Sequence, residues 1–229
     1  MKTIGLIGGM SWESSAEYYR RINQLVRNQL GGNASAKSVM VSVDFVGIEA
    51  LQHQGDWTGL AEQMVKAASQ LQNAGADCIV LCTNTMHKLA TAIEAAVPLP
   101  FIHIVDATAE VLKREGVRRV GLLGTSFTME DGFYQERMGK HGIDAVTPGA
   151  EDRLVVHRAI YQELCRGVFE ASTRRTLMSI MNRLVMQKVE GIVLGCTELG
   201  LTLRPADATV PMYDSTHIHA AAAVEFAMS

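Results

Sequence analysis

The sequence predicts an α/β protein in which parallel sheets are flanked by helices. Short apolar segments alternate with longer amphipathic segments along the whole chain, which is typical of strand–helix units. Several apolar segments run directly into glycine, where the backbone can turn tightly. One of these strand-and-turn patterns occurs twice, which indicates an internal duplication. We therefore expect two pseudo-symmetric lobes, each a parallel sheet flanked by helices.

Two matched pairs of segments carry the repeat. Residues 4–10 and 120–126 are each an apolar strand that runs into a glycine turn, and residues 79–85 resemble residues 192–198. Aligning the second pair places Thr83 opposite Cys196. Chance similarity between apolar strands is the alternative interpretation. The spacing favours duplication, because the glycine turn and the Cys/Thr position lie 75 residues apart in the first half and 72 in the second.

The first half of the chain predicts three strand–helix units. Residues 14–17, Ser14-Ser15-Ala16-Glu17, have the character of a helix start, and the glycines after Leu30 end that helix. Residues 48–56 read as a loop. The expected strands cover residues 4–8, 39–45 and 77–82, and the expected helices cover residues 14–30, 57–74 and 86–96.

The second half repeats the alternation. Gly116 ends one expected helix, and Gly191 follows the turn that ends another. The expected strands cover residues 101–105, 119–123, 143–146, 191–195 and 210–213. The expected helices cover residues 106–115, 134–140, 154–164, 172–187 and 216–228.

Two prolines, Pro98 and Pro100, mark a boundary between the lobes. The last strand and helix are expected to pack back on the first half. The N-terminal lobe would then comprise residues 1–98 plus 207–229, and the C-terminal lobe residues 99–206. This arrangement predicts an active site in the cleft between the lobes.

Composition excludes several classes of protein. The 229-residue chain is 48% hydrophobic and 20% charged, as in globular proteins, and its formal charge of −3 gives no reason to expect nucleic acid or an anionic membrane as a partner. The N-terminus shows no signal-peptide layout, and no apolar run is long enough to span a membrane. The four cysteines form no CxxC pair, so we expect reduced thiols in a cytoplasmic protein.

Cys196 is the strongest candidate for chemistry. It follows a glycine at the end of an apolar strand and precedes an expected helix start, which favours an accessible thiol of lowered pKa. The alternative is an inert buried thiol, a role that suits Cys78 better because Cys78 lies within a strand. Strand alternation should point Cys82 away from the face of Thr83.

Other motifs give weaker evidence for a function. The first glycine turn lacks the G-x-G-x-x-G spacing of dinucleotide sites, and no Gly-Lys-Ser/Thr follows it, although its N–H groups suit a carboxylate. His217 and His219 have no partner cluster, so we expect no metal. His87 is either a histidine on a helix face or a substrate contact.

Four motifs along nearly the whole chain make it resemble the aspartate/glutamate racemase family of cofactor-independent amino-acid racemases. They are Gly8-Gly9-Met10, Cys82-Thr83-Asn84-Thr85-Met86-His87, Gly124-Thr125-Ser126-Phe127-Thr128-Met129 and Gly195-Cys196-Thr197-Glu198. The resemblance implies a small amino-acid substrate held between two lobes, no cofactor and a homodimer. It places catalysis at Thr83 and Cys196 and substrate binding at Met10, Gln52, Asn84, Thr85, Thr125, Ser126, Thr128, Cys165, Thr197 and Glu198.

The implied reaction needs two acid/base groups on opposite faces of a planar intermediate, because no pyridoxal phosphate delocalises the charge. Thiols suit this role since their pKa is readily shifted toward neutrality. Most family members have a cysteine where this chain has Thr83. A hydroxyl is a far weaker acid, so we expect Cys196 to be the competent base and the two directions to differ.

The expected substrate range is broad. Aspartate-specific members have an arginine and a lysine where this chain has Gln52 and Cys165, and the loss of both cations weakens strict aspartate specificity. Three alternatives stay open: a hydantoin racemase, a related decarboxylase, and a non-catalytic sensor that binds an amino acid without turning it over.

Overall fold

The computed structural model describes all residues 1–229 and divides into two compact units. Unit 1 comprises Met1–His103 and His219–Ser229, and unit 2 comprises Ile104–Ile218. Each unit contains its own four-stranded sheet, and every strand pair in both sheets is parallel. The predicted α/β class with two parallel sheets is therefore confirmed.

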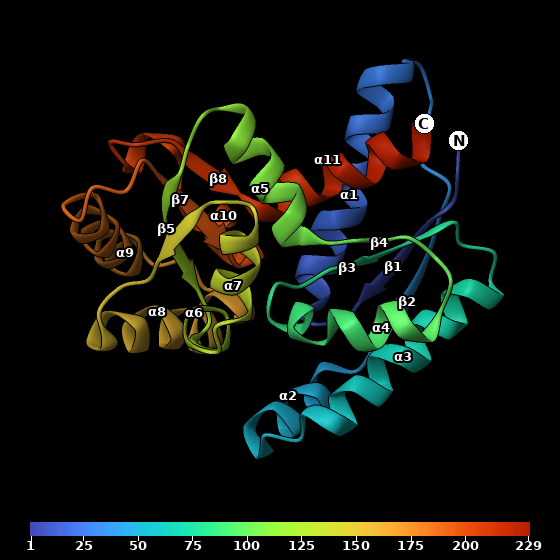
Figure 1. Cartoon of the computed structure of the whole chain (residues 1–229), viewed down its shortest axis with the longest axis horizontal. Helices are drawn as coiled ribbons and strands as arrows, with labels where there is room; N and C mark the ends of the chain where they lie inside the picture. The colour runs from blue at the N-terminus through green and yellow to red at the C-terminus, as the bar shows by residue number, and fades with distance from the viewer. The chain divides into compact units, whose positions relative to one another are not determined.

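The sheet of unit 1 has the strand order β2-β1-β3-β4. Side chains of β1 and β3 alternate between two apolar cores, one packed with α3 and α4 and the other with α1 and α11 (Figure 1). Both strands are therefore apolar along their whole length. The elements are β1 (Ile4–Gly8), α1 (Trp12–Leu30), β2 (Ser38–Ser42), α2 (Phe45–Gln54), α3 (Trp57–Asn73), β3 (Cys78–Leu81), η1 (Thr85–Leu89), α4 (Ala90–Ala96), β4 (Phe101–Ile102) and α11 (Ser215–Met228), the last of which enters unit 1 at His219.

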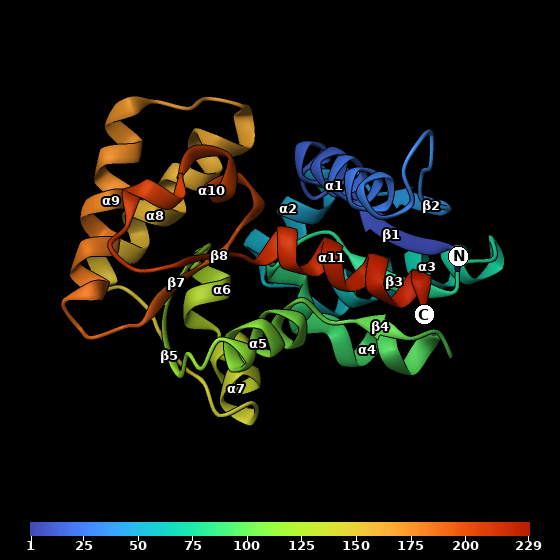
Figure 2. The same cartoon turned by 90° about the horizontal axis from the view of Figure 1, so that it is seen from above.

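The sheet of unit 2 has the order β6-β5-β7-β8. Figure 2 labels three of its strands, β5, β7 and β8. One of its cores packs against α8 and α9, and the other packs against α5 and α7. The elements are α5 (Ile104–Arg114), β5 (Arg119–Gly124), α6 (Ser126–Glu130), α7 (Phe133–Lys140), β6 (Asp144–Val146), α8 (Ala150–Gln162), η2 (Leu164–Arg166), α9 (Ala171–Val185), β7 (Gly191–Gly195), α10 (Thr197–Thr202), η3 (Pro205–Asp207) and β8 (Met212–Asp214).

The two sheets have the same topology, as the internal repeat predicts. In unit 2, Gly124 at the end of β5 lies beside Gly195 at the end of β7. In unit 1, Ile7 lies beside Leu81, so the next step of the register brings Gly8 beside Cys82. Thr83 and Cys196 therefore follow equivalent strand ends, in agreement with the alignment of the two halves.

The structure corrects the predicted lobe boundaries. Phe101 pairs with Ile79 of β3, so the short strand assigned to the second half completes the sheet of unit 1. Met212 pairs with Ile192 of β7, so the last strand stays in unit 2 and only the helix after it enters unit 1. The divisions fall at 103/104 and 218/219 instead of at 98/99 and 206/207. The expected substrate cleft between the lobes stays a prediction.

The segment read as a loop over residues 48–56 is mostly helix α2. The carboxylate of Asp44 accepts a hydrogen bond from the N–H of Val46 and starts the helix, and Gly55 ends it at a φ of 70°. The predicted second strand is correspondingly shorter and ends at Ser42. The cap is not evident from the sequence because Asp44 lies inside an otherwise apolar run.

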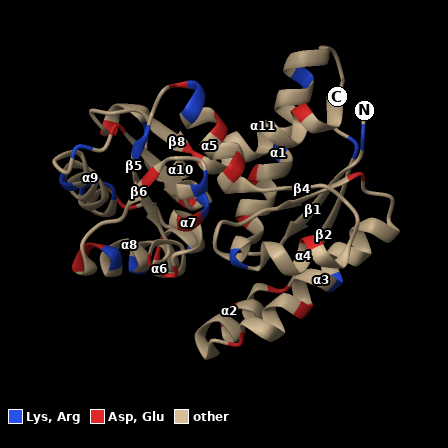
Figure 3. Cartoon of the chain, in the orientation of Figure 1, with Lys and Arg blue, Asp and Glu red and all other residues tan.

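Charged residues lie mostly on the helices and loops around each sheet (Figure 3). The central strands β1, β3 and β7 contain none. No helix is both long enough and apolar enough to cross a membrane.

Candidate functional site

The turn after β1 is built from glycine and serine. Gly9 has a φ of +95°, and a Cβ there would lie 2.1 Å from the carbonyl oxygen of Val43, so only glycine fits. The N–H of Gly9 donates to Ser15 Oγ at 2.7 Å, and Ser14 Oγ donates to the carbonyl of Cys82 at 3.1 Å. These bonds tie the start of α1 to the ends of both β1 and β3. The sequence predicts only a helix-capping role for these two serines.

Thr83 follows β3 and is part-exposed, whereas its neighbours Cys82 and Asn84 are buried. The N–H of Thr83 donates to the carbonyl of Leu81 at 2.8 Å. The carbonyl of Thr83 lies 2.7 Å from Nδ1 of His87. Hydrogen bonds thus hold both the N–H and the carbonyl of Thr83. Between its two buried neighbours, Thr83 is the residue that solvent reaches.

Cys82 has the environment of a structural thiol. It is fully buried in the core of α1 and α11, and burial raises the pKa of its thiol strongly. Cys78 lies in the same core, where burial raises the pKa of its thiol to about 11. Cys82 therefore lies in a different core of unit 1 from Met10 and Met86.

Four candidate substrate contacts of unit 1 are buried: Met10, Gln52, Asn84 and Thr85. Met10 packs in the apolar core that also contains Met86. Gln52, on α2, donates from Nε2 to the sulfur of Met86 at 3.3 Å. Met86 thus joins Met10 and Gln52 in one cluster near η1, although it was not among the predicted contacts.

Cys196 follows β7 and occupies the N-cap position of α10. The residue as a whole is part-exposed, and its thiol donates to Glu198 Oε2 at 3.0 Å. Burial of the sulfur, followed by the negative charge of Glu198, raises the pKa of the Cys196 thiol well above its usual value. The prediction of a lowered pKa is therefore wrong, because burial of the sulfur and the carboxylate next to it outweigh the favourable position at a helix start.

Hydroxyl groups gather at the ends of β5 and β7. Thr125 caps α6 by accepting from the N–H of Thr128 at 3.3 Å. Thr197 accepts from Thr216 Oγ1 at 3.2 Å. A Cβ on Gly195 would lie 3.3 Å from the methyl group of Thr128 and 2.9 Å from a backbone oxygen, so glycine lets these ends approach closely.

The remaining predicted contacts of unit 2 are Ser126 and Cys165. The N–H of Ser126 donates to Nδ1 of His157 at 3.2 Å. Cys165 lies in η2 and packs against the same core as Cys196, near enough to add to the rise in the pKa of that thiol. Unit 2 therefore brings Cys165, Cys196 and Glu198 into one neighbourhood.

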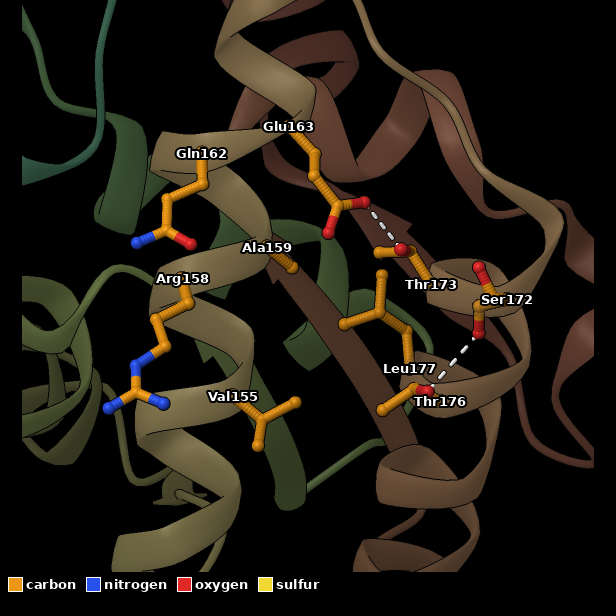
Figure 4. A pocket seen from close by; sticks show the side chains of 9 residues that line it. All are labelled: Val155, Arg158, Ala159, Gln162, Glu163, Ser172, Thr173, Thr176 and Leu177. Carbon is orange, nitrogen blue, oxygen red and sulfur yellow. Dashed lines mark hydrogen bonds between the residues drawn. The ribbon is translucent and has the colours of Figure 1, made fainter.

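A pocket of about 310 Å³ lies elsewhere in unit 2, between α8 and α9 (Figure 4). Glu163 reaches toward Thr173 across it, whereas Arg158 and Gln162 point away from α9. None of the predicted site residues lines this pocket.

The sequence profile of the Asp/Glu/Hydantoin racemase family matches residues 7–223. The chain belongs to this family. This membership makes it a racemase, and therefore an isomerase.

Two crystal structures resemble the racemase over its whole length. A Yersinia pestis protein proposed to be an Asp/Glu racemase is 52% identical, with a TM-score of 0.93 and 100% of each chain covered. An aspartate racemase homologue from Pyrococcus horikoshii OT3 is 32% identical, with a TM-score of 0.87 and again 100% of each chain covered. The broad specificity amino-acid racemase RacX of Bacillus subtilis is 21% identical over 225 residues, which cover 93% of this chain and 92% of RacX.

Proposed function

We propose that this racemase moves the Cα proton of an amino acid between Cys196 and Thr83 without pyridoxal phosphate. The observation that carries the proposal is the register of the two sheets, which puts these residues at equivalent strand ends. Both are the part-exposed residues among buried neighbours. Inversion requires removal of a proton from one face of Cα and its return on the other, and two related strand ends supply two such groups.

Cys196 is the base in this proposal. In the resting state its thiol proton is shared with Glu198 across 3.0 Å, so Glu198 is the nearest acceptor when the thiolate forms. The charge of Glu198 raises the pKa of the thiol. A substrate ammonium group beside Glu198 would offset that charge and favour the thiolate. Binding of the substrate and activation of the thiol would then be coupled.

Thr83 is the weaker partner. Its hydroxyl does not supply a base at neutral pH, so it would act by passing a proton to or from water or by protonating the intermediate. The two stereochemical directions should consequently proceed at different rates. The hydroxyls of Thr85, Thr125, Thr128 and Thr197 and the N–H groups of the glycine turns would bind the carboxylate and stabilise the charge that develops on it.

The substrate range is proposed to be broad. Where aspartate-specific members have an arginine and a lysine, this chain has the amide of Gln52 and the thiol of Cys165, and neither is a cation. RacX matches most of this chain's length, and its name describes a racemase of broad specificity, which supports the same proposal. A homodimer and a cytoplasmic location stay predictions.

The test is exchange of the Cα proton in D₂O, followed by proton NMR over a panel of L- and D-amino acids and by chiral analysis of the products. Exchange with inversion for at least one amino acid is the expected result. Saturable binding without exchange would favour the amino-acid sensor instead. Exchange confined to hydantoins, or loss of a carboxyl group, would favour the two related enzyme classes.

A further inference from the structure

His87 lies in η1, four residues after Thr83, and is buried. Its Nδ1 lies 2.7 Å from the carbonyl oxygen of Thr83. A carbonyl oxygen only accepts, so Nδ1 carries a hydrogen and donates it. The tautomer of His87 is thereby fixed by the backbone of the residue to which we assign the second proton transfer.

This bond completes a closed turn around Thr83. The N–H of Thr83 donates back to Leu81, and the N–H of His87 donates to the carbonyl of Asn84 at 3.1 Å. Both backbone polar groups of Thr83 are therefore bound within the turn. The direction of its hydroxyl depends on this backbone and on one side-chain torsion.

The ring of His87 is itself held by other rings of unit 1. Its centroid lies 4.6 Å from that of His103, 5.5 Å from that of His219 and 5.4 Å from that of Phe101. His219 donates from Nε2 to the carbonyl of Ile102 at 2.6 Å and accepts from the hydroxyl of Tyr18 at 2.8 Å. Residues from α1, β4 and α11 thus fix the position of the ring that donates to Thr83.

The equivalent strand end of unit 2 has no such ring. The carbonyl of Cys196 accepts from the N–H of Leu199 at 3.2 Å, which is an ordinary bond of a helix start. Gly200 stands four residues after Cys196, where unit 1 has His87. We call the hydrogen bond from His87 Nδ1 to the carbonyl of Thr83 the clamp. It therefore belongs to the Thr83 side alone, where the acid is weaker and its placement matters more.

We propose that His87 is a positioning residue that holds Thr83 in the geometry needed for proton transfer to the second face of Cα. This inference rests on the proposed function. His87 acts through the backbone of Thr83 and needs no contact with substrate. Removal of the donor should slow the steps that use Thr83 and spare those that use Cys196.

The experiment separates these steps by comparing exchange with inversion. Starting from the enantiomer whose proton Cys196 removes, return of a solvent proton on the same face gives exchange with retention and uses Cys196 only. Inversion also requires Thr83. The readout is the ratio of inversion to exchange, measured by chiral analysis and proton NMR on the same samples in D₂O.

Three substitutions at position 87 test the clamp. His87→Phe keeps an aromatic ring and removes the donor, and His87→Gln places an amide beyond the position of Nδ1. His87→Asn places its amide near the position of Nδ1 and should restore the bond. We expect Phe and Gln to lower the ratio about tenfold or more, because small misplacements of reacting groups are costly, and Asn to recover most of it. His217→Asn, on an exposed residue, is the matched control and should leave the ratio unchanged.

Exchange and inversion that fall in parallel in the Phe and Gln variants would overturn the inference, since that is the result of a purely structural role. An unchanged ratio in a folded variant would overturn it as well, and the Gln variant decides the matter if the Phe variant does not fold. Failure of the proposed function looks different. In that case the unmodified protein itself shows no exchange with any amino acid.

Discussion

The ends of β3 and β7 occupy equivalent places in two sheets of the same strand order, yet they carry different acids. Thr83 follows β3, and Cys196 follows β7. A thiol ionises far more readily than an aliphatic hydroxyl. In the proposed reaction, the duplicated backbone therefore fixes where each proton-transfer group stands, whereas the side chain at that point differs between the halves.

The surroundings of the two ends differ as much as the residues themselves. Cys196 lies against the carboxylate of Glu198, which raises the pKa of the thiol. Thr83 lies against His87, which belongs to a group of buried histidines. We therefore propose that electrostatics control the proton at the Cys196 end and that geometry controls it at the Thr83 end. Four predictions break or sharpen this contrast.

The largest effect is expected from Cys196→Ser. Loss of the thiol should lower Cα exchange by roughly 10³-fold or more, because a positioned acid/base group commonly contributes between about 10² and 10⁴. Exchange in D₂O measured by proton NMR checks this. Cys78→Ser is the matched control, since that thiol lies in a core of unit 1. Equal exchange in both variants would remove Cys196 from the reaction.

The second prediction is that acid lowers the stability of unit 1, which contains both Thr83 and His219. Burial lowers the pKa of His219 from 6.5 to about 4. Between these values the unfolded chain binds a proton that the folded chain does not. The contribution of the neutral His219 ring to the free energy of unfolding is therefore fully present above pH 6.5 and is lost as the pH drops toward 4. The free energy of unfolding should decrease by about 3 kcal/mol over this range.

Denaturant unfolding at several pH values measures this decrease. His219→Gln should remove this part of the pH dependence, and His217→Gln, on an exposed residue, should keep it. Hydrogen exchange should show amides of β1 and β3 losing protection in acid before those of β5 and β7. Identical slopes for the two variants would show that His219 does not carry the effect.

Much of the fold and part of the site are predictable from the sequence. Apolar strands that end in glycine identify β1, β3, β5 and β7, and their repeat aligns Thr83 with Cys196 before any coordinates are known. The partner of a short strand is not encoded locally, so the sequence pattern alone places Phe101 and Met212 in the wrong units. The pKa of the Cys196 thiol depends on its burial and on where Glu198 points. The hydrogen bond to the carbonyl of Thr83 depends on a ring that distant residues hold in place.

The third prediction makes the two ends alike. Thr83→Cys should accelerate the slower stereochemical direction by about tenfold or more, because a stronger acid would then stand on the second face. Initial rates from each enantiomer, followed by chiral analysis, give the two directions separately. Cys82→Ser, combined with the same change, controls for the neighbouring thiol. No gain in either direction would count against Thr83 as the limiting partner.

The smallest effect is expected from Glu198→Gln, which changes the electrostatics of the Cys196 end and keeps its shape. Removal of the negative charge should lower the pKa of the Cys196 thiol, since that charge helps to raise it. Alkylation by iodoacetamide as a function of pH measures this shift, with Cys196→Ser as the control that identifies the reacting thiol. The rate of Cα exchange should nevertheless fall, because the variant also lacks the acceptor for the thiol proton. A lower pKa together with faster exchange would mean that Glu198 only restrains the thiol, and that another group takes its proton.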